Sequence, residues 1–253
     1  MRDRLVLDPA SAIVGPSTAW TKGGTMCPNE KVWFAGHERH GCFLISVASM
    51  LSIVLPDYEW AEILHLVQDS RVPIAWGSLR RNMSEAPDRA FQAHSIFLVC
   101  CAMLNMPTFL VTASDMGFNE QSDDRSKCYK VTWDGSDVEL RETSTPVAEA
   151  CRIHPAIVVY TRPPPRDDDF YLTGMFLDLY KMDDQQQHII GGHTAVAQHL
   201  DDGRYVLLDS GDSDAMAFSS EEDLYVYTMA SYPDTVTYRA QYVGLVFDET
   251  CFT

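Results

Sequence analysis

The sequence is poor in positive charge. It has 19 lysine and arginine residues against 36 aspartate and glutamate residues, so its formal net charge is −17. A surface of this charge repels the phosphate groups of nucleic acids and of anionic lipids. We therefore expect neither nucleic acid nor a membrane surface as a partner, and the charge favours a basic protein or peptide.

Long apolar runs and paired cysteine motifs are also missing. No stretch of about 18 apolar residues occurs, so no membrane-spanning helix is expected, and the residues after Met1 do not form the apolar stretch of a secretion signal. The seven cysteines have no regular spacing and form no CxxC pair. This pattern argues against a disulfide framework and favours a reducing, cytoplasmic location.

The rest of the composition is that of a globular protein, with 46% hydrophobic residues in a chain of 253. The pattern predicts an extended arm over residues 1–36 and a single domain over residues 37–253. Helical patterns come first and strand patterns follow, so the predicted fold is α+β with an antiparallel sheet. The predicted helices cover 42–54, 58–68 and 89–105, and the predicted strands lie within 108–112, 128–139, 156–160 and 235–247. Residues 163–190 are predicted to form an insertion or lid, and an inserted helix is one interpretation of the amphipathic residues 170–187.

Cys42 is the first candidate for chemistry. It follows Gly41 and opens the apolar segment 42–54, which only three serines interrupt, so the predicted helix is buried on nearly all sides. Unpaired N–H groups and the positive end of the helix dipole stabilise a thiolate in the first turn, and the same N–H groups can bind an oxyanion. A buried structural cysteine is the alternative interpretation.

A histidine and an aspartate frame a predicted hairpin later in the chain. The loop Asp201-Asp202-Gly203 suits a three-residue turn with Gly203 in the left-handed conformation and a bulge. In that register His193 and Asp209 are diagonal neighbours on one face of the sheet. A two-residue turn would place Asp212 opposite His193 instead. A strand-end histidine beside a turn-forming aspartate is the structural alternative.

The order Cys42, His193, Asp209 resembles that of the papain-like superfamily of cysteine peptidases, in which the nucleophile opens a buried helix and the other two residues follow on the sheet. The strand 205–210 resembles the strand that ends in the orienting residue of Josephin-type deubiquitinases. Residues 101–111 are similar to the equivalent segment of Josephin-type and ovarian-tumour-type deubiquitinases. The resemblance covers residues 37–210 in outline and only a small part of them closely.

The resemblance implies a thiol hydrolase that cleaves a peptide or isopeptide bond without a cofactor. Cys42 would attack the carbonyl, His193 would carry the proton and Asp209 would orient the imidazole. The backbone N–H of Cys42, together with His37, would bind the oxyanion. The implied substrates are a protein or peptide, such as a ubiquitin-like C-terminal tail or a self-encoded polyprotein.

Two departures from the family pattern keep other functions open. Gly36 and His37 stand where papain-like enzymes usually carry Gln, and the Asp-Gly-x-Cys motif of ovarian-tumour-type enzymes is absent before Cys42. One alternative is an inactive papain-like protein with a structural or interaction role in a larger assembly, such as a viral one. A Cys-His-Asp acyltransferase is another.

Metal binding is the remaining alternative use of these side chains. Imidazole and thiolate are zinc ligands, but the spacing of His37, His40, Cys42 and His193 matches no common zinc finger. The acidic runs 167–169, 183–184 and 209–214 are better explained as solvated loops than as cation sites. We therefore expect no metal.

Overall fold

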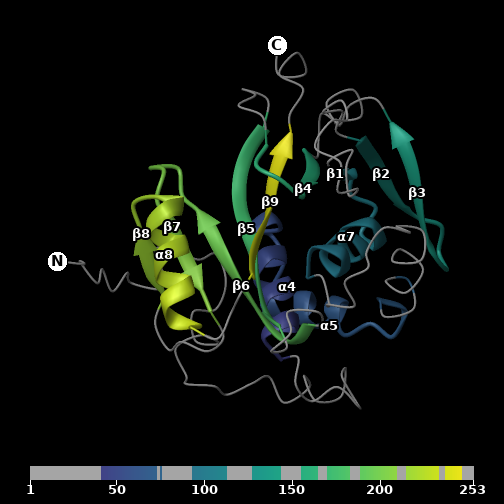
Figure 1. The fold of residues 1–253 in the computed structure, drawn as a ribbon. Coiled ribbons are helices and arrows are strands. Elements are labelled where there is room, and N and C mark those ends of the chain that lie inside the picture. The colour runs from purple at the N-terminus through teal and green to yellow at the C-terminus, as the bar shows by residue number, and fades with distance from the viewer. Residues whose placement is uncertain are drawn as a thin grey trace, which may run out of the picture. The chain divides into compact units, whose positions relative to one another are not determined.

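The computed structural model describes residues 41–72, 75, 93–112, 127–143, 155–164, 170–182, 189–209, 215–233 and 237–246. These residues contain four helices and nine strands, so the predicted α+β class is confirmed (Figure 1). The chain divides into two compact units. The first comprises Met1–Asp69, Asp88–Ala93 and Thr173–Arg239, and the second comprises Ser70–Pro87, His94–Leu172 and Ala240–Thr253. The single domain over residues 37–253 stays a prediction, and the predicted arm 1–36 lies outside the described residues.

Helix α4, Gly41–Val54, is the buried helix that the sequence predicts in the first unit. Most of its side chains are at most 7% exposed, namely those of Phe43, Leu44, Ser46, Val47, Ala48, Ser49, Met50, Leu51, Ser52 and Val54. The helix stops before Pro56, whose ring nitrogen has no hydrogen to donate. Helix α5, Trp60–Val67, follows and contacts α4, and a capping box between Glu59 and Glu62 begins it.

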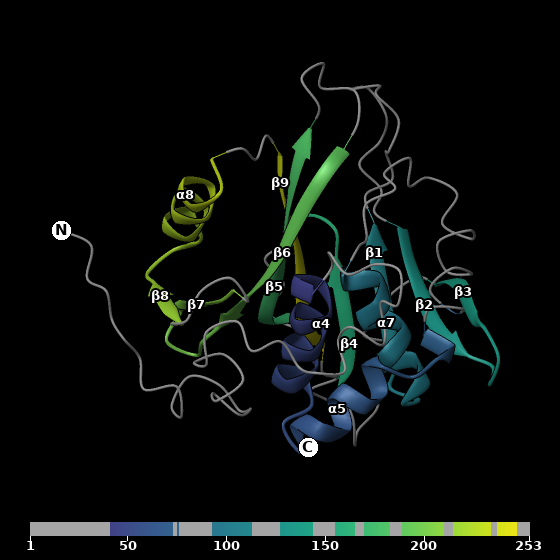
Figure 2. The same cartoon turned by 90° about the horizontal axis from the view of Figure 1, so that it is seen from below.

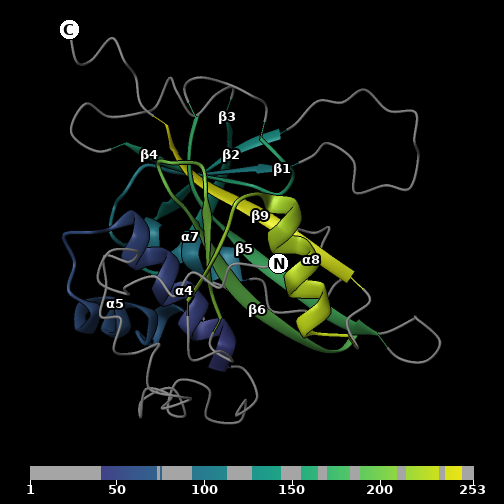
Figure 3. The same cartoon turned by 90° about the vertical axis from the view of Figure 1, so that its left-hand side faces the viewer.

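The sheet of the first unit consists of four strands in the order β5-β6-β7-β8. Each strand is antiparallel to its neighbour in this order. The strands are β5 (Phe170–Met182, of which the first three residues belong to the second unit), β6 (Ile189–His199), β7 (Tyr205–Leu208) and β8 (Met216–Phe218). Helix α4 packs on β6 (Figure 2). Helix α8, Glu221–Ser231, contacts β7 and β8 and lies on the other side of β6 from α4 (Figure 3). The sequence Ser219-Ser220-Glu221-Glu222 has the pattern of a helix cap, and the Ser220 side chain accepts a hydrogen bond from the Asp223 N–H.

Residues 170–182 form β5, so the interpretation of this segment as an inserted helix is wrong. Residues 173–180 are all buried, so both faces of the strand are covered and the alternation of polar and apolar residues that marks a half-buried strand is lost. Gly174 permits a close approach, because a Cβ there would lie 2.7 Å from the Ala197 carbonyl oxygen. Residues 165–169 and 183–188 of the predicted lid lie outside the described residues.

The second unit has the strand order β3-β2-β1-β4-β9 and helix α7, Ala93–Met103. Its strands are β1 (Thr108–Thr112), β2 (Lys127–Trp133), β3 (Val138–Thr143), β4 (Ala156–Tyr160) and β9 (Thr237–Val246, from Ala240 onward in this unit). Strand β1 is parallel to β4, so the prediction of an antiparallel sheet is wrong for this pair and the sheet is mixed. The chain between β1 and β4 includes the β2–β3 hairpin. This whole connection is long enough to join two parallel strands.

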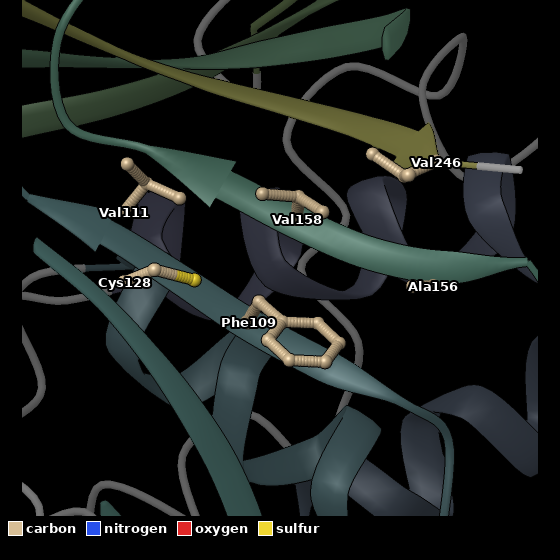
Figure 4. Packing of buried hydrophobic residues seen from close by; sticks show 6 residues of the cluster. All are labelled: Phe109, Val111, Cys128, Ala156, Val158 and Val246. Carbon is tan, nitrogen blue, oxygen red and sulfur yellow. The ribbon is translucent and has the colours of Figure 1, made fainter. Parts of the chain in front are cut away.

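Two turns in this unit contain a residue with positive φ. Asn105, with φ of 57°, lies in the turn that follows α7. Gly135, with φ of 99°, lies in the turn between β2 and β3. The strands bury an apolar cluster on one face, which Figure 4 shows from close by, formed by Phe109, Val111, Cys128, Ala156, Val158 and Val246. No helix in the described part of the chain is long and apolar enough to cross a membrane.

Candidate active site

The β6–β7 hairpin has the turn that its loop sequence predicts. Gly203 has φ of 85°, its N–H donates to the Leu200 carbonyl at 2.9 Å, and the Leu200 N–H donates to the Arg204 carbonyl at 2.8 Å. Asp202 supports the turn by accepting hydrogen bonds from the backbone and the guanidinium of Arg204. These bonds fix a register in which Val196 pairs with Leu208. The predicted register is confirmed.

This register brings His193 and Asp209 together, as predicted. His193 lies on β6, and Asp209 directly follows β7. The His193 Nε2 and the Asp209 Oδ1 are 2.8 Å apart, and the Asp209 side chain is only 2% exposed against 17% for His193. A buried carboxylate beside an imidazole holds the ring in one orientation and stabilises its protonated form. Asp212, the alternative partner, lies outside the described residues.

Cys42 in the first turn of α4 is the third member of the cluster, because its side chain lies near enough to His193 to raise the pKa of the imidazole. Nε2 of the ring faces Asp209. One turn further along α4, the Ser46 hydroxyl donates to the Thr194 carbonyl at 2.9 Å. This buried bond joins the helix that carries the cysteine to the strand that carries the histidine.

Tyr232 is a member of the cluster that the sequence did not predict. Its hydroxyl donates to Asp209 Oδ2 at 2.7 Å and lies 2.9 Å from His193 Nε2. The residue follows α8 as its C-cap, a position determined by how that helix packs on β7 and β8. No spacing or motif around Tyr232 signals this contact, because it joins residues 39 positions apart.

The environment of His193 strongly favours its protonated form. Burial is the largest single influence on its pKa and lowers it, since it disfavours the charged ring. The interactions with Asp209 and Cys42 act in the opposite direction and prevail, so the pKa of His193 rises from 6.5 to about 10. The site therefore places an imidazolium near a cysteine in the first turn of a helix, which is an arrangement found at reactive cysteines.

The other described cysteines lie in apolar surroundings. Of the four described, Cys42 alone is partly exposed, whereas Cys100, Cys101 and Cys128 are buried. Burial raises the pKa of Cys128 to about 11, and burial together with the neighbouring Cys100 raises the pKa of Cys101 well above its usual value. Cys100 and Cys101 both lie in the core, as expected for cysteines within the apolar segment 89–105. The thiols of Cys101 and Cys128 therefore resist ionisation and are poor nucleophiles.

Two predicted contributors lie outside the described residues, namely the oxyanion donor His37 and the alternative zinc ligand His40. Within the described ranges, no group of three or more His, Cys, Asp or Glu side chains is placed to hold a metal ion. The backbone N–H of Cys42 is in the first turn of α4, where N–H groups have no carbonyl partner within the helix. It is therefore available to a developing oxyanion.

The cluster thus combines a partly exposed thiol, a histidine that shares its proton, a buried carboxylate that orients this histidine, and an N–H donor at a helix terminus. This combination suits nucleophilic attack on a carbonyl carbon. No protein-family model matches the chain, and searches of curated proteins and of solved structures gave no match either.

Proposed function

We propose that this protein is a papain-like thiol hydrolase that cleaves a peptide or isopeptide bond. The observation that carries the proposal is a His193 ring that is bound through Nε2 to buried Asp209 and lies near enough to Cys42 for this side chain to raise the pKa of the imidazole. A structural cysteine has no need of either partner. The three residues come from α4, from β6 and from the end of β7, and all belong to the first unit.

The proposed reaction begins when the Cys42 thiolate attacks the carbonyl carbon and the carbonyl oxygen takes the electron pair. The Cys42 backbone N–H donates to this oxyanion. As the intermediate collapses, the C–N bond breaks and the His193 proton passes to the leaving amine. A thioester on Cys42 and a neutral His193 remain.

The second half of the reaction returns the enzyme to its first state. The neutral His193 takes a proton from a water molecule, whose oxygen attacks the thioester. The C–S bond then breaks, the carboxylic acid leaves, and the proton on His193 again faces a Cys42 thiolate. Asp209 holds the imidazole throughout, through the 2.8 Å contact to Nε2.

The charge of the chain favours a basic substrate segment. With 17 more acidic than basic residues, the protein attracts a positively charged tail over a distance of about 10 Å at ordinary salt. A ubiquitin-like C-terminal tail is the proposed substrate, and a polyprotein junction is the second class within the same chemistry.

The proposal is tested with ubiquitin carrying a C-terminal vinyl methyl ester, an electrophile that traps catalytic thiols. We expect one covalent adduct, mapped by mass spectrometry to Cys42, and release of a fluorescent amine from the ubiquitin C-terminus. Cys42→Ala should abolish both, while its thermal unfolding stays that of the unchanged chain. Replacing Cys27, Cys151 and Cys251 by serine should leave the adduct intact, which excludes labelling at these positions.

Other outcomes would assign a different function. Product release that requires an added amine and transfers the acyl group to it would indicate an acyltransferase. Hydrolysis that persists in Cys42→Ala would contradict the proposal directly. An unchanged chain that neither forms an adduct nor cleaves ubiquitin or basic peptide substrates would indicate a protein that acts as a structural or interaction component.

A further inference from the structure

The side chain of Tyr232 contacts both His193 and Asp209, although the position of this residue at the end of α8 does not require these contacts. It caps the C-terminus of α8, where its backbone N–H donates to the Thr228 carbonyl at 3.2 Å. This backbone bond ends the helix whatever the side chain is. The side chain is half-buried and reaches the candidate site.

The hydroxyl of Tyr232 closes a ring of three hydrogen bonds. It donates to Asp209 Oδ2 at 2.7 Å, while the His193 Nε2–H is shared between Asp209 Oδ1 at 2.8 Å and the Tyr232 oxygen at 2.9 Å. Both carboxylate oxygens are thereby engaged, so the Asp209 carboxylate is held against rotation. The proton on Nε2 has two acceptors, which favours the forms of the imidazole that carry a proton on this nitrogen.

The aromatic ring of Tyr232 also stacks on the imidazole. The two ring centroids are 4.5 Å apart and the planes differ by 25°. An aromatic face beside a protonated imidazole stabilises the cation and covers one side of it against water. The stack and the hydrogen bonds to Nε2 together restrict rotation of the imidazole about its side-chain torsions.

From these contacts we infer that Tyr232 is a positioning residue for His193. It holds the imidazole in one orientation, and it shields the hydrogen bond between His193 and Asp209 from water. The inference rests on the proposed function, because it assigns Tyr232 a task within that site.

Two substitutions separate the hydroxyl from the ring. Tyr232→Phe removes the two hydrogen bonds and retains the stack, and Tyr232→Leu removes both. Tyr225→Leu is the matched control, because Tyr225 lies on the same helix, is 43% exposed and contacts Tyr238. A loss that comes only from weakening α8 would appear in the control as well.

The first measurement is the rate of alkylation of Cys42 by iodoacetamide at pH 6 in the full chain. Loss of the hydroxyl should slow the reaction about three- to tenfold, as expected for one or two modest hydrogen bonds. Loss of the whole side chain should slow it about 10- to 100-fold, since small misplacements of reacting groups have effects of this size. Tyr225→Leu should change the rate less than about twofold.

The second measurement does not depend on Cys42 reactivity. At neutral pH His193 is protonated, because its pKa is about 10, so its Nε2–H gives a signal in the ¹H–¹⁵N spectrum of ring-labelled histidine. We expect a signal that exchanges slowly with water in the unchanged chain, a shifted signal in Tyr232→Phe and rapid exchange in Tyr232→Leu. The His193→Gln variant identifies the signal by its absence.

The outcomes distinguish the two claims. If Cys42 reacts no faster than an ordinary thiol but the Nε2–H signal responds to Tyr232, the proposed function fails and the positioning role holds. If alkylation and the Nε2–H signal are unchanged in both Tyr232 variants, the inference is overturned.

Discussion

The hydroxyl of Ser46 donates a buried 2.9 Å hydrogen bond to the backbone carbonyl of Thr194. Ser46 lies one helical turn after Cys42, and Thr194 directly follows His193. The two residues are 148 positions apart, so the bond fixes α4 against β6 where the thiol and the imidazole must meet. The alignment of the candidate site thus depends on a contact that takes no part in the chemistry.

Ser46→Ala should lower the free energy of unfolding by about 1–3 kcal/mol, because it leaves a buried carbonyl without this donor. It should also slow alkylation of Cys42. Ser52→Ala is the matched control. Ser52 is equally buried in α4, but its hydroxyl bonds to the Ala48 carbonyl of its own helix, which the helix already satisfies. Chemical denaturation and alkylation rates check both variants, and equal effects on alkylation in the two would contradict the aligning role of Ser46.

Asp209→Asn should lower the pKa of His193 from about 10. In the unchanged site, the hydrogen bond and the negative charge of Asp209 favour the imidazolium against the opposing effect of burial, so their loss leaves only Cys42 to oppose burial. NMR titration of ring-labelled histidine measures this change. Asp202→Asn, in the exposed hairpin loop, is the control and should leave the His193 titration unchanged.

The pH dependence of hydrolysis should follow the same group. His193 must carry a proton to the leaving amine, so the rate should fall as pH rises through about 10, where this proton is lost. In Asp209→Asn the fall should move to lower pH, and the rate at neutral pH should decrease about 10²–10⁴-fold. A fall at the same pH in both proteins would show that His193 does not set it.

Gly174→Ala should destabilise the first unit by about 1–3 kcal/mol. A Cβ at this position would lie 2.7 Å from the Ala197 carbonyl oxygen and 3.2 Å from Met50 Cε, so β5, β6 and α4 would have to move apart. Gly135→Ala is the comparison, because its Cβ meets no atom within 4 Å and only its φ of 99° opposes the change. Thermal unfolding should show the larger loss for Gly174→Ala, and a variant as stable as the unchanged chain would contradict the packing.

The parts of the fold with a strong local signal could be predicted from the sequence. The apolar run after Gly41 predicts the buried helix α4, and the loop Asp201-Asp202-Gly203 predicts the register that places His193 beside Asp209. Both predictions depend on forces between residues close in sequence, such as helix periodicity and the left-handed conformation that Gly203 adopts.

The parts that depend on distant contacts could not be predicted. Strand β5 is covered on both faces, so its sequence lacks the alternation of a half-buried strand. The parallel pairing of β1 with β4 joins Thr108 to Ile157 with no local signal. Tyr232 reaches the site only because α8 packs beside β7 and β8.

The reaction of Cys42 with iodoacetamide at pH 6 tests the central claim most directly, namely that Cys42 and His193 form a thiolate–imidazolium pair. An ordinary thiol is almost fully protonated at this pH and reacts slowly. The account predicts that Cys42 is alkylated much faster than a free thiol at this pH, and that His193→Ala lowers the rate to that of a free thiol. Alkylation of Cys42 at the rate of a free thiol, equal in the unchanged chain and in His193→Ala, would contradict it.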